Sequence, residues 1–185
     1  SQLVRITLDG KSTPLGSPAL FDEFTPSPDG KYILVQAMHR PFSYREMLDR
    51  FPRTISVWDP SGKPIKQIAD LPLHDAIPVD FAAVQTGPRE FEWRADADAE
   101  LCWVEARDGG DPKRKAAVRD ELLCLAAPFT GKPRVLLQLS LRYGGVRWGT
   151  GALALVNEWW WSDRKTRTWI IAPDDKKPTS EVLWD

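Results

Sequence analysis

The sequence predicts an all-β fold, a β-propeller fragment of about three and a half four-stranded antiparallel blades. The main observation is a hairpin that recurs four times along the chain, with a second hairpin preceding three of its copies. The 16 prolines and 12 glycines support this prediction, because so many turn-forming residues suit short strands better than long helices.

The first hairpin consists of an apolar strand, a turn containing Gly or Asp, a lysine and a second short strand. Its first half reads "ITLDGK", "SVWDPSGK", "CLAAPFTGK" and "WIIAPDDK", ending at residues 11, 63, 132 and 176. The second strands read "TPLG", "PIKQIA", "PRVLLQL" and "SEVLW". Apolar runs on both sides of such turns are typical of β-hairpins, so we expect four hairpins of one type.

The second hairpin has an aromatic-bearing strand, a tight turn and an apolar strand, as in "FTPSPDGKYILVQA", "FEWRADADAELCWVEA" and "VRWGTGALALVNEW". Joined to the first hairpin, it makes a blade of strands A to D. Residues 19–71, 89–140 and 143–184 are predicted to be blades, and residues 1–18 to be strands C and D of another. An open set of blades would bare sheet faces, so the chain is predicted to be part of a longer protein and to self-associate.

Helical periodicity is almost absent from the sequence. The segment "SYREMLDRF" (43–51) is predicted to form a short helix inside a loop, with Met47 and Phe51 on one side. No apolar run approaches the roughly 20 residues that span a bilayer. The 25 basic and 26 acidic residues give no basic excess for nucleic acid, so neither a membrane nor a nucleic acid is expected as a partner.

The two cysteines, Cys102 and Cys124, are too few for a disulfide scaffold or a zinc site, and no metal or cofactor is expected. They fall on adjacent strands of one predicted blade, where they face each other closely enough to bridge. Because cross-strand bridges are strained, we expect buried free thiols.

The stretch "NEWWWSDRKTRTW" (157–169) places three tryptophans before a basic segment. We expect these tryptophans to end strand B of the last blade, with Trp159 and Trp161 on one face and Trp160 on the other. At least one should be deeply packed, while Arg164, Lys165 and Arg167 should lie in a solvated loop before a strand that begins at Trp169. Stacking on nucleic-acid bases is the alternative.

Two further segments contain charged residues. The segment "EARDGGDPKRKAAVRDE" (105–121) contains Asp108 and Asp111 but not the ligand spacing of a calcium EF-hand, so we expect a charged, flexible loop. In "LRYGGVRWG" (141–149), the sequence does not decide whether Arg142 and Arg147 line a channel or form ion pairs.

A family resemblance rests on several stretches: "HRPFSY" with "RFPRTISVWD", "GPREFEWRADADAELCWVEARDGGD", "LRYGGVRWG" and "ALVNEWWWSDRKTRTWIIAPDD". Together they resemble the β-propeller domain of the glutamyl endopeptidase branch of the prolyl oligopeptidase family, over residues 24–175. The resemblance implies a propeller of about seven blades before an α/β-hydrolase domain with a Ser-His-Asp triad. It also implies a bacterial extracytoplasmic location, such as the periplasm, or a plastid.

The chain departs from that family because it has no Gly-x-Ser-x-Gly elbow, and its only histidines are His39 and His74. The catalytic domain is therefore expected to be absent, and no catalytic residue is assigned. We expect His39 to be a structural residue bonded to a backbone carbonyl, with a functional donor as the alternative. His74 is assigned no role.

The resemblance places the loop "MHRPFSYREMLDRFPRT" (38–54) on the face that the peptidase domain covers. Arg40, Arg45, Arg50 and Arg53 are then candidates to meet an acidic substrate side chain, because a guanidinium can bond a carboxylate twice. We favour Arg40 and Arg50; the alternative is that these arginines pair with Glu46 or Asp49 or lie free in water.

The function predicted from this resemblance is to gate access for a peptide substrate and to orient it for the chain's own C-terminal hydrolase domain. The expected partners are thus the peptide and that domain. The alternative is a non-catalytic propeller that serves as a protein-binding scaffold.

Overall fold

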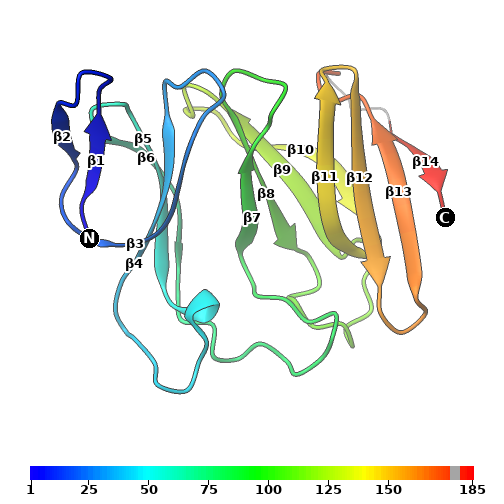
Figure 1. Cartoon of the computed structure of the whole chain (residues 1–185). Helices are drawn as coiled ribbons and strands as arrows, with labels where there is room; N and C mark the ends of the chain where they lie inside the picture. Colours follow the sequence, from blue (N-terminus) through cyan, green and yellow to red (C-terminus); the bar gives the residue numbers. More distant parts are fainter. Residues whose placement is uncertain (176–179) are drawn as a thin grey trace. The chain divides into compact units, whose positions relative to one another are not determined.

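The computed structural model describes residues 1–175 and 180–185, which form two compact units, 1–75 and 76–185. The described residues form antiparallel sheets, one of two strands and three of four, with almost no helix (Figure 1). The predicted all-β class is therefore confirmed. The turn that contains Lys176 lies outside the described residues.

The first unit contains a two-stranded and a four-stranded sheet. The hairpin pairs β1 (Leu3–Ile6) with β2 (Ser12–Leu15). The larger sheet has the order β3-β4-β5-β6, with bounds Leu20–Pro26, Ile33–Met38, Arg53–Trp58 and Pro64–Leu71. Sequence order and spatial order agree, as expected for strands joined by hairpin turns.

The second unit contains two four-stranded sheets (Figure 1). One comprises β7 (Pro88–Trp93), β8 (Glu100–Ala106), β9 (Asp120–Ala126) and β10 (Arg134–Leu139). The other comprises β11 (Arg142–Thr150), β12 (Leu153–Trp160), β13 (Lys165–Ile171) and β14 (Ser180–Trp184). Each sheet is a meander of the kind that the repeated hairpins predict.

The core of the second unit lies between its two sheets. Buried residues of β8, β9 and β10, among them Val104, Leu122 and Leu139, pack with Val156 and Ile171 of the other sheet. Strand β8 is buried over five consecutive residues and β9 over six, so neither shows the alternation of a strand with one wet face. Face-to-face packing therefore explains the unbroken apolar runs in the sequence.

A smaller core joins the two sheets of the first unit, where Leu3 and Leu15 pack with Val35 and Trp58. These two sheets come close together at Gly62, which lies in the turn between β5 and β6. Gly62 has φ +87°, and a Cβ built there would lie 2.5 Å from the backbone nitrogen of Gly16. Only glycine fits this position without a backbone shift.

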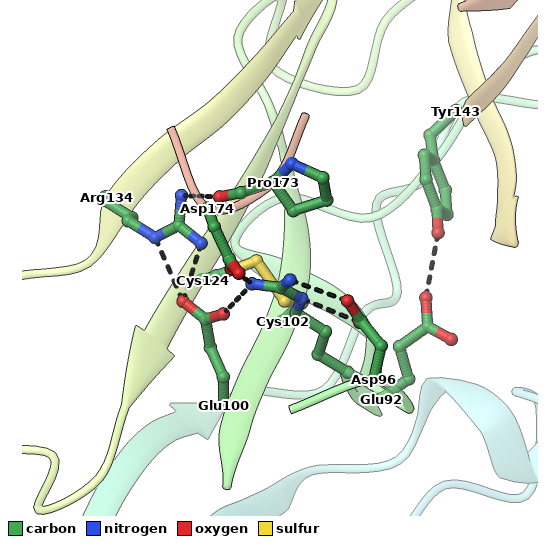
Figure 2. The surroundings of a disulfide bond; sticks show 10 residues. Glu92, Asp96, Glu100, Cys102, Cys124, Arg134, Tyr143, Pro173 and Asp174 are labelled. Carbon is green, nitrogen blue, oxygen red and sulfur yellow. Dashed lines mark hydrogen bonds and ion pairs between the residues drawn. A yellow bond between two sulfur atoms is a disulfide. The ribbon is translucent and has the colours of Figure 1, made fainter. Parts of the chain in front are cut away.

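The short helix predicted within the segment 43–51 is present only as a three-residue 3₁₀ turn, Leu48–Arg50. No residue of this turn is buried, so a longer helix would have no core to pack against. The prediction for the cysteines is wrong. Cys102 and Cys124 are not free thiols: they form a disulfide between β8 and β9 (Figure 2). The two residues are directly paired in the ladder, which brings their side chains together.

No helix in the described part of the chain has the length and hydropathy to span a bilayer.

Candidate functional site

The predicted arginine loop connects β4 to β5 in the first unit. Its base is closed by a hydrogen bond from the His39 backbone N–H to the Pro52 carbonyl, 3.0 Å long. Above this closure the loop exposes large apolar side chains, which are Phe42, Tyr44, Met47 and Leu48. The loop thus presents apolar and cationic groups together on a fixed base.

The arginines of this loop have different surroundings. Arg50 pairs with Glu46 at 3.0 Å, and Arg53 pairs with Asp22 across the sheet. Arg40 lies over the Phe42 ring, with its guanidinium carbon 5.3 Å from the ring centre. Within the described residues neither Arg40 nor Arg45 forms an ion pair, and both are exposed.

These contacts bear on which arginines are free to bind an anion. Arg53 also donates to the Leu48 carbonyl at 2.9 Å, so its guanidinium is committed to holding the loop. Arg50, one of the two favoured residues, already has a carboxylate partner, Glu46, four residues before it in the chain. Arg40 and Arg45 retain free N–H donors, so an incoming carboxylate would displace only water from them.

His39 has both ring nitrogens engaged. Nδ1 lies 2.7 Å from the Arg40 carbonyl oxygen and Nε2 lies 2.8 Å from Asp70 Oδ1. The backbone contact and the nearby carboxylate both raise the pKa of His39 above its usual value. The predicted backbone-carbonyl partner is therefore present, and it fixes the first residue of the loop.

His74, which was assigned no role, is the residue that sequence reasoning missed. Its side chain is buried, and its backbone N–H donates to the Arg50 carbonyl at 2.9 Å. Nε2 has no hydrogen-bond partner within the described residues. Burial, together with the charges of Arg53 and Arg50, lowers the pKa of His74, so the ring stays neutral near pH 7. Two prolines and an Asp beside it in sequence gave no sign of this burial.

A network of buried charges lies in the second unit, where the loop between β8 and β9 meets the first residues of β9 and β11. Arg142 donates from Nη2 to Asp108 Oδ2 at 2.7 Å and from Nη1 to Asp120 Oδ1 at 3.0 Å. Arg119 also binds Asp108, at 2.8 Å, and Arg89 binds Asp120. The prediction of a charged, flexible loop is wrong for Asp108, which is fully buried and held by two arginines. Arg142 is ion-paired, whereas Arg147 is exposed.

A second network surrounds the disulfide, as Figure 2 shows. Arg94, almost fully buried, binds Asp96 at 2.7 Å, Glu100 at 2.8 Å and Asp174 at 2.7 Å. Arg134 on β10 donates to Glu100 and to the Pro173 carbonyl at 2.8 Å. These contacts tie the β7–β10 sheet to the segment after β13, so this network is structural.

The tryptophan stretch differs from its prediction. Trp159 and Trp160 are half-buried and Trp161 is 39% exposed, so none of the three is deeply packed. The buried residue at this end of β12 is Glu158, whose carboxylate accepts from the Trp169 indole N–H at 3.0 Å. The deeply buried side chain at this end of β12 is therefore a hydrogen-bonded carboxylate, Glu158, and not one of the three tryptophans.

The basic segment also departs from a solvated loop. Arg167 lies within β13, where it binds Glu158 at 3.0 Å and Asp185 at 3.1 Å. Trp169 is thus in the middle of a strand and not at its start. Arg164 fits the prediction better, because it is exposed in the turn and lies over the Trp161 ring.

The described residues offer no cluster of three or more His, Cys, Asp or Glu side chains that could hold a metal ion. His39 and Thr54 both bond to Asp70, at 2.8 Å and 3.3 Å, so the carboxylate and not the histidine lies next to the hydroxyl. The exposed apolar side chains of the arginine loop, and its two arginines that form no ion pair among the described residues, suit contacts with anionic and apolar groups.

No protein-family model matches this chain. The chain is 43% identical over 187 residues to a protein of Oryza sativa subsp. japonica named "Probable glutamyl endopeptidase, chloroplastic". It is 42% identical to a protein of the same name from Arabidopsis thaliana. Both alignments cover 100% of this chain but only 20% and 19% of those proteins, so the chain spans about a fifth of the length of these relatives.

Among solved structures, one titled "Crystal structure of the eukaryotic initiation factor" aligns with 91% of this chain and 47% of its own, at 13% identity and a TM-score of 0.40. At this TM-score the likeness carries no argument about fold or function. The similarity that informs function is the sequence identity to the two plant proteins.

Proposed function

We propose that this chain is a non-catalytic part of a peptidase related to the glutamyl endopeptidases, and that it gates and orients the peptide substrate. The catalytic Ser-His-Asp triad would lie on a hydrolase domain outside these residues. The observation that carries the proposal is the identity of 43% to a protein of that name, spread over the whole chain.

The sheets support the finer proposal that the chain is part of a β-propeller. Each four-stranded sheet is an antiparallel meander, and in both units the core lies between two sheets. Sheets that pack face to face in sequence order are what propeller blades require. On this proposal residues 19–71, 89–140 and 143–184 are blades, and residues 1–18 contribute to another.

The arginine loop is the proposed contact with the substrate. It has four arginines and two acidic residues between positions 39 and 53, which gives a formal net charge of +2. Arg40 and Arg45 have free donors, while Arg50 and its Glu46 partner form the edge of the same loop. An acidic peptide side chain would therefore be attracted to this loop and bonded there.

The test uses the intact peptidase that contains this chain, with Arg40→Ala and Arg45→Ala variants. We expect kcat/KM for a peptide with Glu at the cleavage site to fall about tenfold, which corresponds to about 1.4 kcal/mol of transition-state binding. The matched control is Arg5→Ala, which removes an exposed arginine outside the loop. Equal rates for all three variants would refute the role of the loop.

The isolated chain tests the other half of the proposal. A serine-reactive fluorophosphonate probe should label no residue in it, and no cleavage of a Glu-containing fluorogenic peptide should occur. Specific labelling of a serine in this chain would place the nucleophile here and overturn the division of roles.

A further inference from the structure

A pocket of about 600 Å³ lies in the second unit, away from the arginine loop in sequence. Its walls are residues 79–82 of the segment before β7, Pro112, and residues 160–162 at the end of β12. The volume falls in the range of pockets that bind small ligands and peptide side chains. Most of its lining is apolar.

The pocket is built on the buried charge network. Arg142 donates from Nε to the Ala82 carbonyl at 2.7 Å, which holds one wall. The Arg119 guanidinium lies over the Trp160 ring, 3.9 Å from its centre, which supports the other wall. Asp108 binds both arginines, so the two walls share one buried anchor. The pocket is therefore preorganised.

The aromatic groups at its mouth are unusually exposed. Phe81 is 71% exposed and stacks on Trp161, which is 39% exposed, with the ring centres 4.3 Å apart. Val79 beside them is fully exposed. Within the described residues, neither Trp160 nor Trp161 donates a hydrogen bond from its indole N–H. Exposed apolar groups with free donors indicate a binding surface.

Basic residues closely follow two of the pocket-lining segments in the sequence. Lys113, Arg114 and Lys115 directly follow Pro112, are exposed, and form no ion pair in the described structure. Arg164, which follows the lining residues 160–162, has its guanidinium carbon over the Trp161 ring, 4.0 Å from the ring centre. Asp80 is the acidic residue of the lining, and its carboxylate accepts the Ala82 backbone N–H at 3.3 Å. The unpaired cations favour an acidic ligand.

We propose that this pocket binds an extended, proline-containing peptide segment with acidic residues beside its prolines. Proline rings pack against aromatic side chains, and an extended polyproline segment offers carbonyl acceptors that suit free indole N–H donors. The acidic residues would meet the cations that follow Pro112. The proposal does not depend on the peptidase function.

Nucleic acid fits the pocket less well. Stacking of successive bases needs several open ring faces, but Trp161 already contacts Phe81 and Arg164, and Trp160 contacts Arg119. Phe81 is therefore the ring most open to a base. A prolyl ring can instead pack against the edges and remaining faces of several aromatic groups at once.

The test is fluorescence anisotropy with a labelled synthetic peptide of four consecutive prolines flanked on each side by two glutamates. We expect saturable binding to the 185-residue chain, and at least a tenfold weaker affinity for the Trp161→Ala and Phe81→Ala variants. The matched control is Trp184→Ala, because Trp184 is 72% exposed in the same unit but does not line the pocket. Circular dichroism spectra check that each variant is folded.

Other arms of the experiment separate the alternatives. Peptides with alanine in place of proline, or lysine in place of glutamate, should bind at least tenfold more weakly. Absence of binding, or equal affinity of Trp161→Ala and native chains, would overturn the proposal. Tighter binding of oligo(dT) that is lost in Trp161→Ala would identify a nucleic-acid site instead. Self-association that is lost in the same variant would assign the pocket to a second copy of the chain.

Discussion

Replacing Arg142 with methionine should destabilise the chain strongly, because it leaves two buried carboxylates short of a partner. The Arg142 side chain is 1% exposed and those of Asp108 and Asp120 are fully buried. The substitution removes one hydrogen bond to each carboxylate, a third to the Ala82 carbonyl and a long fourth, of 3.4 Å, to the Arg119 carbonyl. Breaking a buried pair from one side typically costs about 3–5 kcal/mol.

The structure favours the lower end of that range. After the substitution Asp108 keeps Arg119 and the Gly110 backbone N–H, and Asp120 keeps Arg89 and the Tyr143 backbone N–H. Neither carboxylate is left alone, and methionine fills much of the lost volume. We therefore expect the free energy of unfolding to fall by about 3 kcal/mol.

Urea denaturation followed by tryptophan fluorescence measures this change, provided that the slope with denaturant is the same in both proteins. The matched control is Arg147→Met on the same strand, where the side chain is exposed and the change should stay within about 0.5 kcal/mol. A loss below about 1 kcal/mol for Arg142→Met would show that the network does not hold the unit together, and would refute the reasoning.

Three further predictions concern the disulfide, the histidines and a turn. The chain unfolded without reductant should show no free thiols, and reduction should lower the free energy of unfolding by about 3 kcal/mol, since the bridge spans 22 residues; two titratable thiols before reduction would contradict this. The pKa of His74 is lowered by folding, so its contribution to stability is complete above pH 6.5 and is lost as the pH falls below it. His74→Gln should flatten this part of a stability–pH profile. Folding raises the pKa of His39, so its contribution is complete below pH 6.5 and is lost as the pH rises above it; His39→Gln should therefore lower stability most below pH 6.5 and remove the fall above it. An unchanged profile for both variants would count against these assignments. Gly62→Ala should cost more than Gly30→Ala by thermal unfolding, because both have positive φ but only Gly62 would place a Cβ against backbone; equal losses would disprove the clash.

The hairpins could be predicted because their determinants are local. Turn residues such as Asp29 and Gly30, with apolar runs on both sides, specify a strand, a turn and a returning strand within a few residues. The pairing of Cys102 with Cys124 across the ladder followed from the same local pattern. The prediction of free thiols at these two positions is wrong, because the sulfur atoms form a disulfide.

The sites were harder to predict because they depend on contacts between distant segments. Glu46 and Asp49 could be named as alternative carboxylate partners for the loop arginines because they are near in sequence, and the structure pairs Glu46 with Arg50. The burial of His74 could not be predicted from the sequence, because it depends on how the segment after β6 packs against the arginine loop. Nor does the sequence show that Trp161 is exposed, because three consecutive tryptophans are also compatible with the buried end of a strand.

The sequence by itself determined the all-β class and the order of the strands, because hydrophobic pattern and turn chemistry repeat along the chain. The likeness to glutamyl endopeptidases is also a property of the sequence, and it rests on particular stretches such as residues 141–149. Only the tertiary structure decided which charged residues are buried. Asp108 and Arg142 are 34 residues apart, and both look like surface residues in sequence. They meet in the interior because two sheets pack face to face there, and a buried charge is tolerated only where such packing supplies its partner.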